Sequence, residues 1–159
     1  MENTKLEIER KFLLKRMPEV NFKETISIEQ FYLPIDEKID GVIRYRKSYT
    51  FGNPEVTFEK IIKQKISAGI NKETDMFVTG SEYMEMLYKR DRNIAKTRSI
   101  FYFNDLKFEV DKFYSLNLII CEIELKDIEQ EIIFPDEIKK EILLEITSFT
   151  QFSNYNLAL

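Results

Sequence analysis

The sequence predicts an α+β domain in which antiparallel β-strands outnumber helices. Three features carry this prediction: apolar and polar side chains alternate over most of the chain, turn sequences separate the alternating segments, and only two segments have clear helical spacing. A length of 159 residues suits one hydrophobic core, so we expect a single domain over residues 1–159.

Eight segments have the period of a β-strand and are rich in Ile, Val, Phe and Tyr. They are Leu6–Leu14, Thr25–Leu33, Gly41–Tyr49, Glu55–Ile66, Lys72–Thr79, Ala95–Phe103, Leu106–Phe113 and Leu118–Leu125. Asn104-Asp105 suits a short hairpin turn between two of them, and Gly52-Asn53-Pro54 separates another two. Consecutive strands are therefore expected to pair as antiparallel hairpins.

Two segments are expected to form helices. Thr79-Gly80-Ser81-Glu82 has the Thr-x-x-Glu pattern of a capping box and precedes an apolar face of Tyr83, Met86 and Leu87. The second helix is expected to begin near Pro135, because the fixed φ of proline suits a first helical turn. Its apolar face would consist of Ile138, Ile142, Leu143 and Ile146.

Composition excludes several kinds of chemistry. The chain has no His, which excludes Ser-His-Asp and Cys-His nucleophile systems and zinc sites built from His and Cys. A net charge of −4 argues against a general nucleic-acid surface, and no apolar run reaches the ~20 residues of a membrane helix. Cys121 has no cysteine partner and no signal-peptide pattern is visible, so we expect a cytoplasmic protein.

Charged side chains in the predicted strands are sorted by sign into doublets on one face. The doublets are Glu7 with Glu9, Arg44 with Arg46, Glu73 with Asp75, Lys96 with Arg98, Glu109 with Asp111, and Glu122 with Glu124, while Lys11 continues the first. Two interpretations stay open: solvated outer faces of a β-sandwich, or the interior of a closed barrel with its helices packed outside. Pure acidic and basic doublets favour the barrel, because like charges on a water-facing sheet repel.

A barrel with this face inward would enclose eight carboxylates and six cations, Lys60 included. Such charges must be hydrated, paired and matched by a ligand, since burying isolated ions is costly. Arginine forks fit phosphate oxygens, and carboxylates without histidine favour Mg²⁺ or Mn²⁺. The implied ligand is a metal-bound polyphosphate.

The segment Glu7-Ile8-Glu9-Arg10-Lys11 resembles the opening Glu-x-Glu-x-Lys of the CYTH family of triphosphate tunnel metalloenzymes. Further motifs follow in the family's order: Arg44-Tyr45-Arg46, Lys96-Thr97-Arg98, Glu109-Val110-Asp111, Glu122-Ile123-Glu124 and the tail Tyr155-Asn156-Leu157-Ala158. Two segments depart from the pattern. Asn71 stands where an arginine is usual, and the Thr-x-Lys strand is out of step, so that Lys60 is the expected inward lysine, with Lys63 and Lys65 as alternatives.

The resemblance implies an eight-stranded antiparallel triphosphate tunnel and a metal-dependent triphosphatase, with inorganic tripolyphosphate as the leading substrate. By this similarity Glu7 and Glu122 would hold one metal, and Glu9 and Glu124 a second metal and the attacking water, with Lys11 in the catalytic set. The implied phosphate contacts are Lys11, Arg44, Arg46, Lys60, Lys96 and Arg98. The remaining tunnel acids are Glu73, Asp75, Glu109 and Asp111.

Other functions of the same fold remain open at this point. They are a class IV-type adenylate cyclase, a thiamine triphosphatase, and a module that binds a nucleotide or polyphosphate without turnover. We expect a small-molecule triphosphate as the partner, with no nucleic acid and no membrane, and the sequence leaves open whether the chain forms a homodimer.

Overall fold

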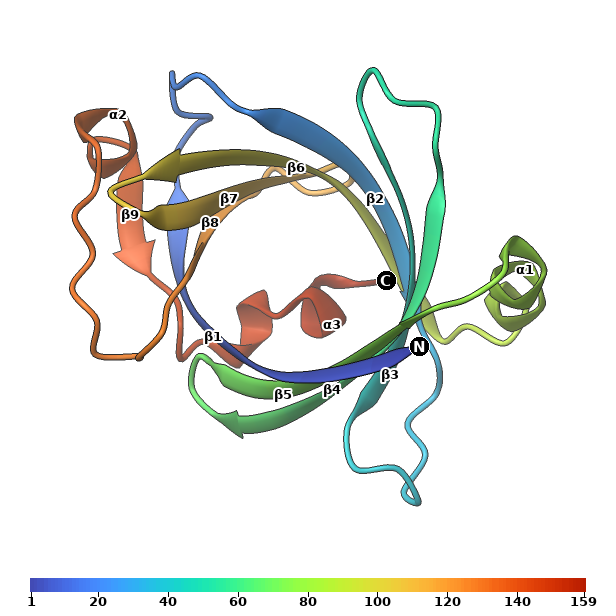
Figure 1. Ribbon diagram of the computed structural model, residues 1–159. Coiled ribbons are helices and arrows are strands. Elements are labelled where there is room, and N and C mark those ends of the chain that lie inside the picture. Colours follow the sequence, from blue (N-terminus) through green and yellow to red (C-terminus); the bar gives the residue numbers. More distant parts are fainter.

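The computed structural model describes residues 1–159 and contains a closed antiparallel β-barrel (Figure 1). Its strands are β1 (Glu2–Leu14), β2 (Glu24–Tyr32), β3 (Val42–Thr50), β4 (Thr57–Ser67), β5 (Ile70–Phe77), β6 (Arg92–Phe103), β7 (Leu106–Phe113) and β8 (Ile119–Glu124). They pair in the order β5-β4-β3-β2-β6-β7-β8-β1, and a further pairing of β1 with β5 closes the barrel. The eight-stranded barrel predicted from the sequence is confirmed, and the sandwich is not formed.

Strand β1 makes the closure possible because its two halves have different neighbours. Glu2–Ile8 pair with Met76–Ile70 of β5, and Glu9–Leu14 pair with Glu124–Ile119 of β8. A strand of 13 residues can therefore bridge both sides of the opening that a shorter strand would leave.

The hairpin turns follow the local sequence. Asn104 and Asp105, between β6 and β7, have φ values of 51° and 61°, the left-handed conformation that a two-residue type I′ turn requires. Gly52 between β3 and β4 has φ of 85°, which glycine adopts without steric cost.

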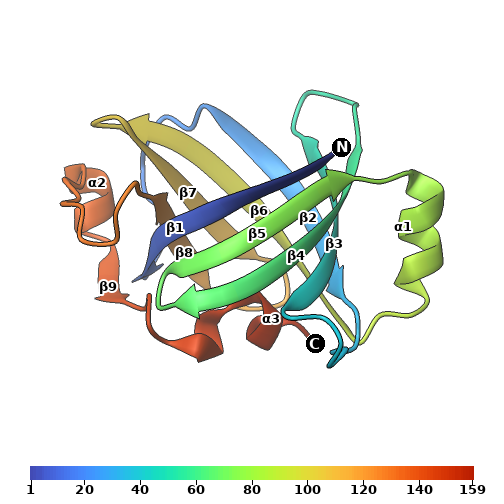
Figure 2. The same ribbon diagram turned by 60° about the horizontal axis from the view of Figure 1, so that its bottom comes forward.

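Helix α1 (Gly80–Leu87) packs on the outside of the barrel, as expected from its pattern (Figure 2). Thr79 Oγ1 accepts a hydrogen bond from Glu82 N at 3.1 Å, which confirms the N-cap. The carboxylate of Glu82 accepts a 3.1 Å hydrogen bond from the hydroxyl of Tyr45 on β3. Tyr83 then packs edge-on against Phe31, which fixes the helix to the outer face of β2 and β3.

The predicted helix after Pro135 is wrong beyond its first turn. Only Asp136–Lys139 is helical (α2), and Ile142–Glu145 forms a ninth strand, β9, paired with Phe12–Leu14 of β1. Apolar residues four apart suit a helical face, but β1 offers free backbone groups here, and tertiary pairing overrides the local pattern. Ile138 of α2 is buried in the largest apolar cluster, outside the barrel.

The C-terminal segment lies at one opening of the barrel (Figures 1 and 2). It contains a 3₁₀ turn, Thr150–Phe152, and a one-turn helix, α3 (Asn154–Leu157). The backbones of Asn93 and Leu159 exchange two hydrogen bonds of 2.8 and 3.1 Å, and the guanidinium of Arg92 lies 4.3 Å from the ring centre of Tyr155. None of the helices has the length and hydropathy of a membrane-spanning segment.

Candidate active site

The sorted charges converge on a cavity of about 190 Å³ inside the barrel. Sixteen residues line it and all but Ile61 and Asn154 are charged. The lining acids are Glu7, Glu9, Glu59, Glu73, Asp75, Glu109, Glu122 and Glu124, and the lining bases are Lys5, Arg44, Arg46, Lys63, Arg98 and Lys107. We call this space the central cavity.

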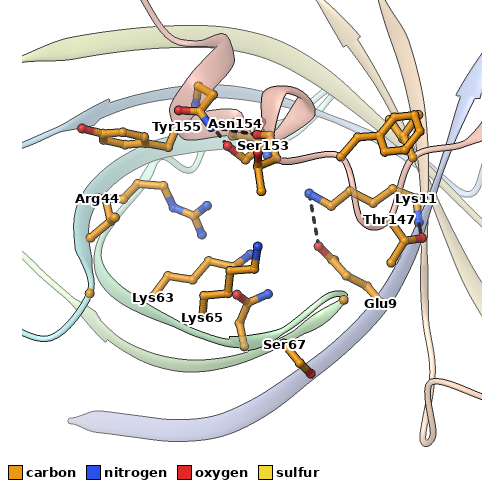
Figure 3. Close-up of a pocket in the computed structure, with 18 of the residues that line it drawn as sticks. Glu9, Lys11, Arg44, Lys63, Lys65, Ser67, Thr147, Ser153, Asn154 and Tyr155 are labelled. Carbon is orange, nitrogen blue, oxygen red and sulfur yellow. Dashed lines mark hydrogen bonds and ion pairs between the residues drawn. The ribbon is translucent and has the colours of Figure 1, made fainter.

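A wider cavity of about 450 Å³, the outer chamber, lies toward the opening covered by α3 (Figure 3). It shares Glu9, Arg44, Lys63 and Asn154 with the central cavity, so the two spaces adjoin. Its other charged lining residues are Lys11, Asp40 and Lys65. The remainder of the wall consists of aromatic, aliphatic, hydroxyl and amide side chains, which makes the chamber less charged than the central cavity.

Strands β1 and β8 bring three predicted acids together. Glu9 and Glu124 are opposite each other in the strand pair, as are Lys11 and Glu122. The ammonium group of Lys11 lies 3.5 Å from Glu9 Oε1 and 3.6 Å from Glu122 Oε1. Glu124 is half exposed, 3.9 Å from Lys107. Lys11 therefore bridges two buried carboxylates, Glu9 and Glu122, that were both predicted as metal ligands.

The two carboxylates differ in their affinity for a proton. Burial, with the negative charge of Glu122 as the next cause, raises the pKa of Glu9 to about 8. Burial also acts to raise the pKa of Glu122, but the charges of Lys11 and Arg98 outweigh it and hold that pKa well below its usual range. A proton or another cation at Glu9 would therefore relieve both the cost of burying its charge and its repulsion with Glu122.

A second group of charges joins β1, β3, β4 and β5. Lys63 Nζ lies 2.6 Å from Glu7 Oε1, and Arg44 Nη2 lies 3.8 Å from Glu73 Oε2. Arg44 Nε and Glu73 Oε2 are buried without a hydrogen-bond partner. Unpaired buried polar atoms are costly, so this pair is better suited to a ligand that supplies the missing partners.

Arg98 and Lys96 form a third group, on β6. Arg98 donates to Glu109 at 2.7 Å, to Glu122 at 3.0 Å and to both oxygens of Asp111 at 2.7 and 2.8 Å. Lys96 Nζ donates to Asp111 at 2.6 Å and to the side-chain oxygen of Asn154 on α3 at 3.0 Å. Burial is the main cause that lowers the pKa of Lys96 to about 8. Lys96 lines neither cavity. Its hydrogen bonds hold the side chains of Asp111 and Asn154 in place.

Arg46 differs from Arg44 and Arg98, the other arginines of the central cavity, because it has no carboxylate partner. Its Nε donates to Gln30 at 3.3 Å, and burial together with the charges of Arg44 and Arg98 lowers its pKa to about 10. The guanidinium group of Arg46 is therefore repelled by those of Arg44 and Arg98 and has no carboxylate of its own, so an anion bound at Arg46 would relieve the repulsion.

The expectation that Lys60 faces the interior is wrong. Lys60 pairs with Tyr45, whose side chain packs outside the barrel, and it has the same parity on β4 as Phe58, which packs on the same outer cluster. Lys63 lines both cavities instead. Strand β4 begins at Thr57 and alternates without interruption, so odd-numbered residues face inward through Lys65. The interior lysine was found only as an alternative, and Asn154 was missed because a neutral residue in a tail carries no charge signal.

The donor set is consistent with Mg²⁺ or Mn²⁺, since only oxygen ligands are available. No three carboxylates approach closely enough to form a ready metal site, because Glu7 and Glu122 are paired with lysine and arginine. The raised pKa of Glu9 nevertheless indicates that Glu9 and Glu122 repel and would gain from a shared cation. Metal binding at these acids would require them to release part of their present ion pairs.

Solved structures share this fold. The inorganic triphosphatase NE1496 matches with a TM-score of 0.63 and 24% identity, over 96% of this chain and 94% of that one. A putative adenylate cyclase from Bacillus halodurans matches with a TM-score of 0.56 and 14% identity, over 86% of this chain and 97% of that one. The Hippeastrum protein HpAC1, a putative adenylyl cyclase described as having dominant triphosphatase activity, matches with a TM-score of 0.51 and 14% identity, over 76% of this chain and 80% of that one. No family model and no curated protein matches the chain. The triphosphate tunnel fold predicted from the sequence is confirmed.

Proposed function

We propose that the chain is a metal-dependent triphosphatase of the CYTH type, a hydrolase that cleaves a phosphoric anhydride bond of inorganic tripolyphosphate or a related triphosphate. One observation carries the proposal: in the central cavity Arg44 Nε has no hydrogen-bond partner and Arg46 has no carboxylate partner, while the carboxylates of Glu9 and Glu122 on the other strands repel each other. A linear anion with several phosphates, bound together with a divalent cation, satisfies both sides at once.

The cations have a defined part in this mechanism. Arg44 and Arg46 bind non-bridging phosphate oxygens. Lys11 and Lys63 add positive charge where the phosphates approach the carboxylates of the barrel. Because these groups are held by strands, they are already oriented when negative charge moves onto the leaving phosphate. Such placement stabilises the transition state without a nucleophilic side chain, which agrees with a chain that lacks histidine.

The acids have a different part. Glu9 and Glu124 orient the attacking water, and the carboxylate of Glu9 takes its proton. The oxygen of the water forms a bond to phosphorus while the bond to the leaving phosphate breaks. Mg²⁺ or Mn²⁺ held by Glu7, Glu9, Glu122 and Glu124 would neutralise phosphate charge and lower the pKa of bound water.

Phosphate release tests the proposal. Wild-type protein is incubated with tripolyphosphate, ATP or thiamine triphosphate in the presence of Mg²⁺ or Mn²⁺, beside Glu9→Gln. We expect release from at least one triphosphate that falls by about 100-fold or more in Glu9→Gln, the range for loss of a catalytic base. Equal release by the two proteins, or none by either, contradicts the proposal.

A cyclase is the second candidate, supported by two structural neighbours described as putative adenylyl or adenylate cyclases. In that reaction the ribose hydroxyl of ATP attacks the α-phosphate in place of water. Cyclic AMP in the ATP reaction would favour it. A third candidate, binding without turnover, is supported by the carboxylates that are already ion-paired, and calorimetric binding of tripolyphosphate without product over hours would favour that one.

A further inference from the structure

The outer chamber contains one cation that the mechanism above does not use. Lys11, Arg44, Lys63 and Lys65 line this chamber, and their side chains point into it (Figure 3). Three of them have a carboxylate partner: Lys11 lies 3.5 Å from Glu9, Lys63 lies 2.6 Å from Glu7, and Arg44 lies 3.8 Å from Glu73. Lys65 forms no ion pair and is exposed to the chamber.

The strand register explains why Lys65 lacks a partner. On the inner face of the β4–β5 pair, Ile61 is opposite Asp75, Lys63 is opposite Glu73, and Lys65 is opposite Asn71. The acidic residues of β5 thus stop one pair short of Lys65. Its positive charge is left without a neutralising neighbour across the strands, while the amide of Asn71 adds a hydrogen-bonding group at the same level.

The position of Lys65 is fixed relative to the acidic side of the tunnel. The β4–β5 hairpin turns at Gly69, which has φ of 77°, and Glu9 N donates a 2.9 Å hydrogen bond to Gly69 O. A side chain at Gly69 would place its Cβ 2.6 Å from Glu9 O, so the two backbones can approach this closely only with glycine there. The hairpin that carries Lys65 is therefore held against the strand that carries Glu9 and Lys11.

Lys65 lines the outer chamber only, whereas Arg46 and Arg98 line the central cavity only. Arg44 and Lys63 line both and lie between these two groups. An anion that contacts Arg46 and Lys65 together must extend across the shared boundary of the two cavities. A short anion bound at the arginines would leave Lys65 unoccupied.

We propose that Lys65 is a substrate-binding residue that holds the outer end of a linear phosphate chain and makes the site selective for three phosphates over two. This inference rests on the proposed function for the identity of the ligand, but its test measures binding and needs no turnover. The ammonium group of Lys65 donates one charge-assisted hydrogen bond to a terminal phosphate oxygen, and the amide of Asn71 lies opposite it on β5.

Calorimetry in metal-free buffer tests the inference, with tripolyphosphate and pyrophosphate as probes. We expect Lys65→Met to weaken tripolyphosphate binding by about 10-fold or more, the effect of losing one charged hydrogen bond, and to change pyrophosphate binding less than about twofold. The matched control is Lys72→Met, which removes the same charge from the outer face of β5, next to Asn71.

A second variant separates a contact from a structural role. The double substitution Lys65→Asn with Asn71→Lys moves the charge across the strand pair at the same level, and we expect it to recover most of the tripolyphosphate affinity. Three results would overturn the role of Lys65. Lys65→Met could weaken the binding of both probes equally, Lys72→Met could weaken tripolyphosphate binding as much as Lys65→Met, or Lys65→Met could leave tripolyphosphate affinity unchanged. If wild type binds tripolyphosphate yet releases no phosphate with Mg²⁺ or Mn²⁺, the proposed hydrolysis fails and the binding result still decides the inference.

Discussion

Arg98 on β6 reaches across β7 to Glu122 on β8, with its Nη2 3.0 Å from Glu122 Oε2. On the way it contacts Glu109 and Asp111 of β7, so one guanidinium group neutralises acids on two neighbouring strands. Arg98 is therefore a structural ion as well as a candidate phosphate contact, and its substitution should differ from that of Arg46.

Replacing Arg98 with Met should destabilise the fold strongly. Three buried carboxylates would lose their main partner, and breaking a buried ion pair from one side costs about 3–5 kcal/mol. Thermal unfolding of the metal-free protein measures the effect as a large fall in Tm. A fall of only 1–2 °C would mean that the acids find other partners or take up protons at little cost.

Replacing Arg46 with Met should leave Tm unchanged or raise it. Arg46 has no carboxylate partner and its pKa is lowered to about 10, chiefly by burial, so its charge is a cost to the folded protein. Tripolyphosphate affinity should fall by about 10-fold or more, because a charged hydrogen bond to phosphate contributes about 1.5–3 kcal/mol. Calorimetry and thermal unfolding on the same sample give both values, and a marked loss of Tm would contradict this account.

The orientation of β4 can be tested with two lysines. Lys63→Met should lower phosphate release by about 10-fold or more, since Lys63 lines both cavities and pairs with Glu7 at 2.6 Å. Lys60→Met should stay within about twofold of wild type, because Lys60 lies on the outer face. The opposite order of effects would show that β4 has shifted its register by one residue.

Stability of the metal-free protein should decrease as pH rises from about 5 to 8. Burial and the charge of Glu122 raise the pKa of Glu9 from 4.5 to about 8, so in this interval the folded chain keeps a proton that the unfolded chain has lost. The contribution is complete at pH values below 4.5 and is lost as pH rises through 8, at about 1.4 kcal/mol per unit. Thermal unfolding across this pH range, with chelator present, measures it.

Glu9→Gln is the control for this dependence. A neutral amide cannot release the proton, so the variant should lack most of the decrease and be more stable than wild type at pH 8. Parallel curves for the two proteins would assign the dependence to another group.

The sequence predicted the inward face of a strand where charged and apolar residues alternate regularly. The prediction failed where a segment fits two interpretations equally well. Inward charges on β1, β7 and β8 follow from period two, because the opposite face of each strand is mainly apolar, whereas the opposite face of β6 also carries Thr97 and Ser99. On β4 both faces carry lysines, Lys60 outside and Lys63 inside, so charge alone could not fix the parity. The spacing of Ile142 and Ile146 fits a helix, and only the presence of the β1 edge makes the segment a strand.

The divided pairing of β1 also has a consequence for how the chain reaches its native state. Residues Glu2–Leu14 must meet both Ile70–Met76 and Ile119–Glu124, so the barrel cannot close until Glu124 has left the ribosome. Contacts this distant in sequence make for slow folding, and until they form, the exposed edges of β5 and β8 are open to wrong partners. A bulky fusion ahead of Glu2 would interfere with this last step more than one placed after Leu159.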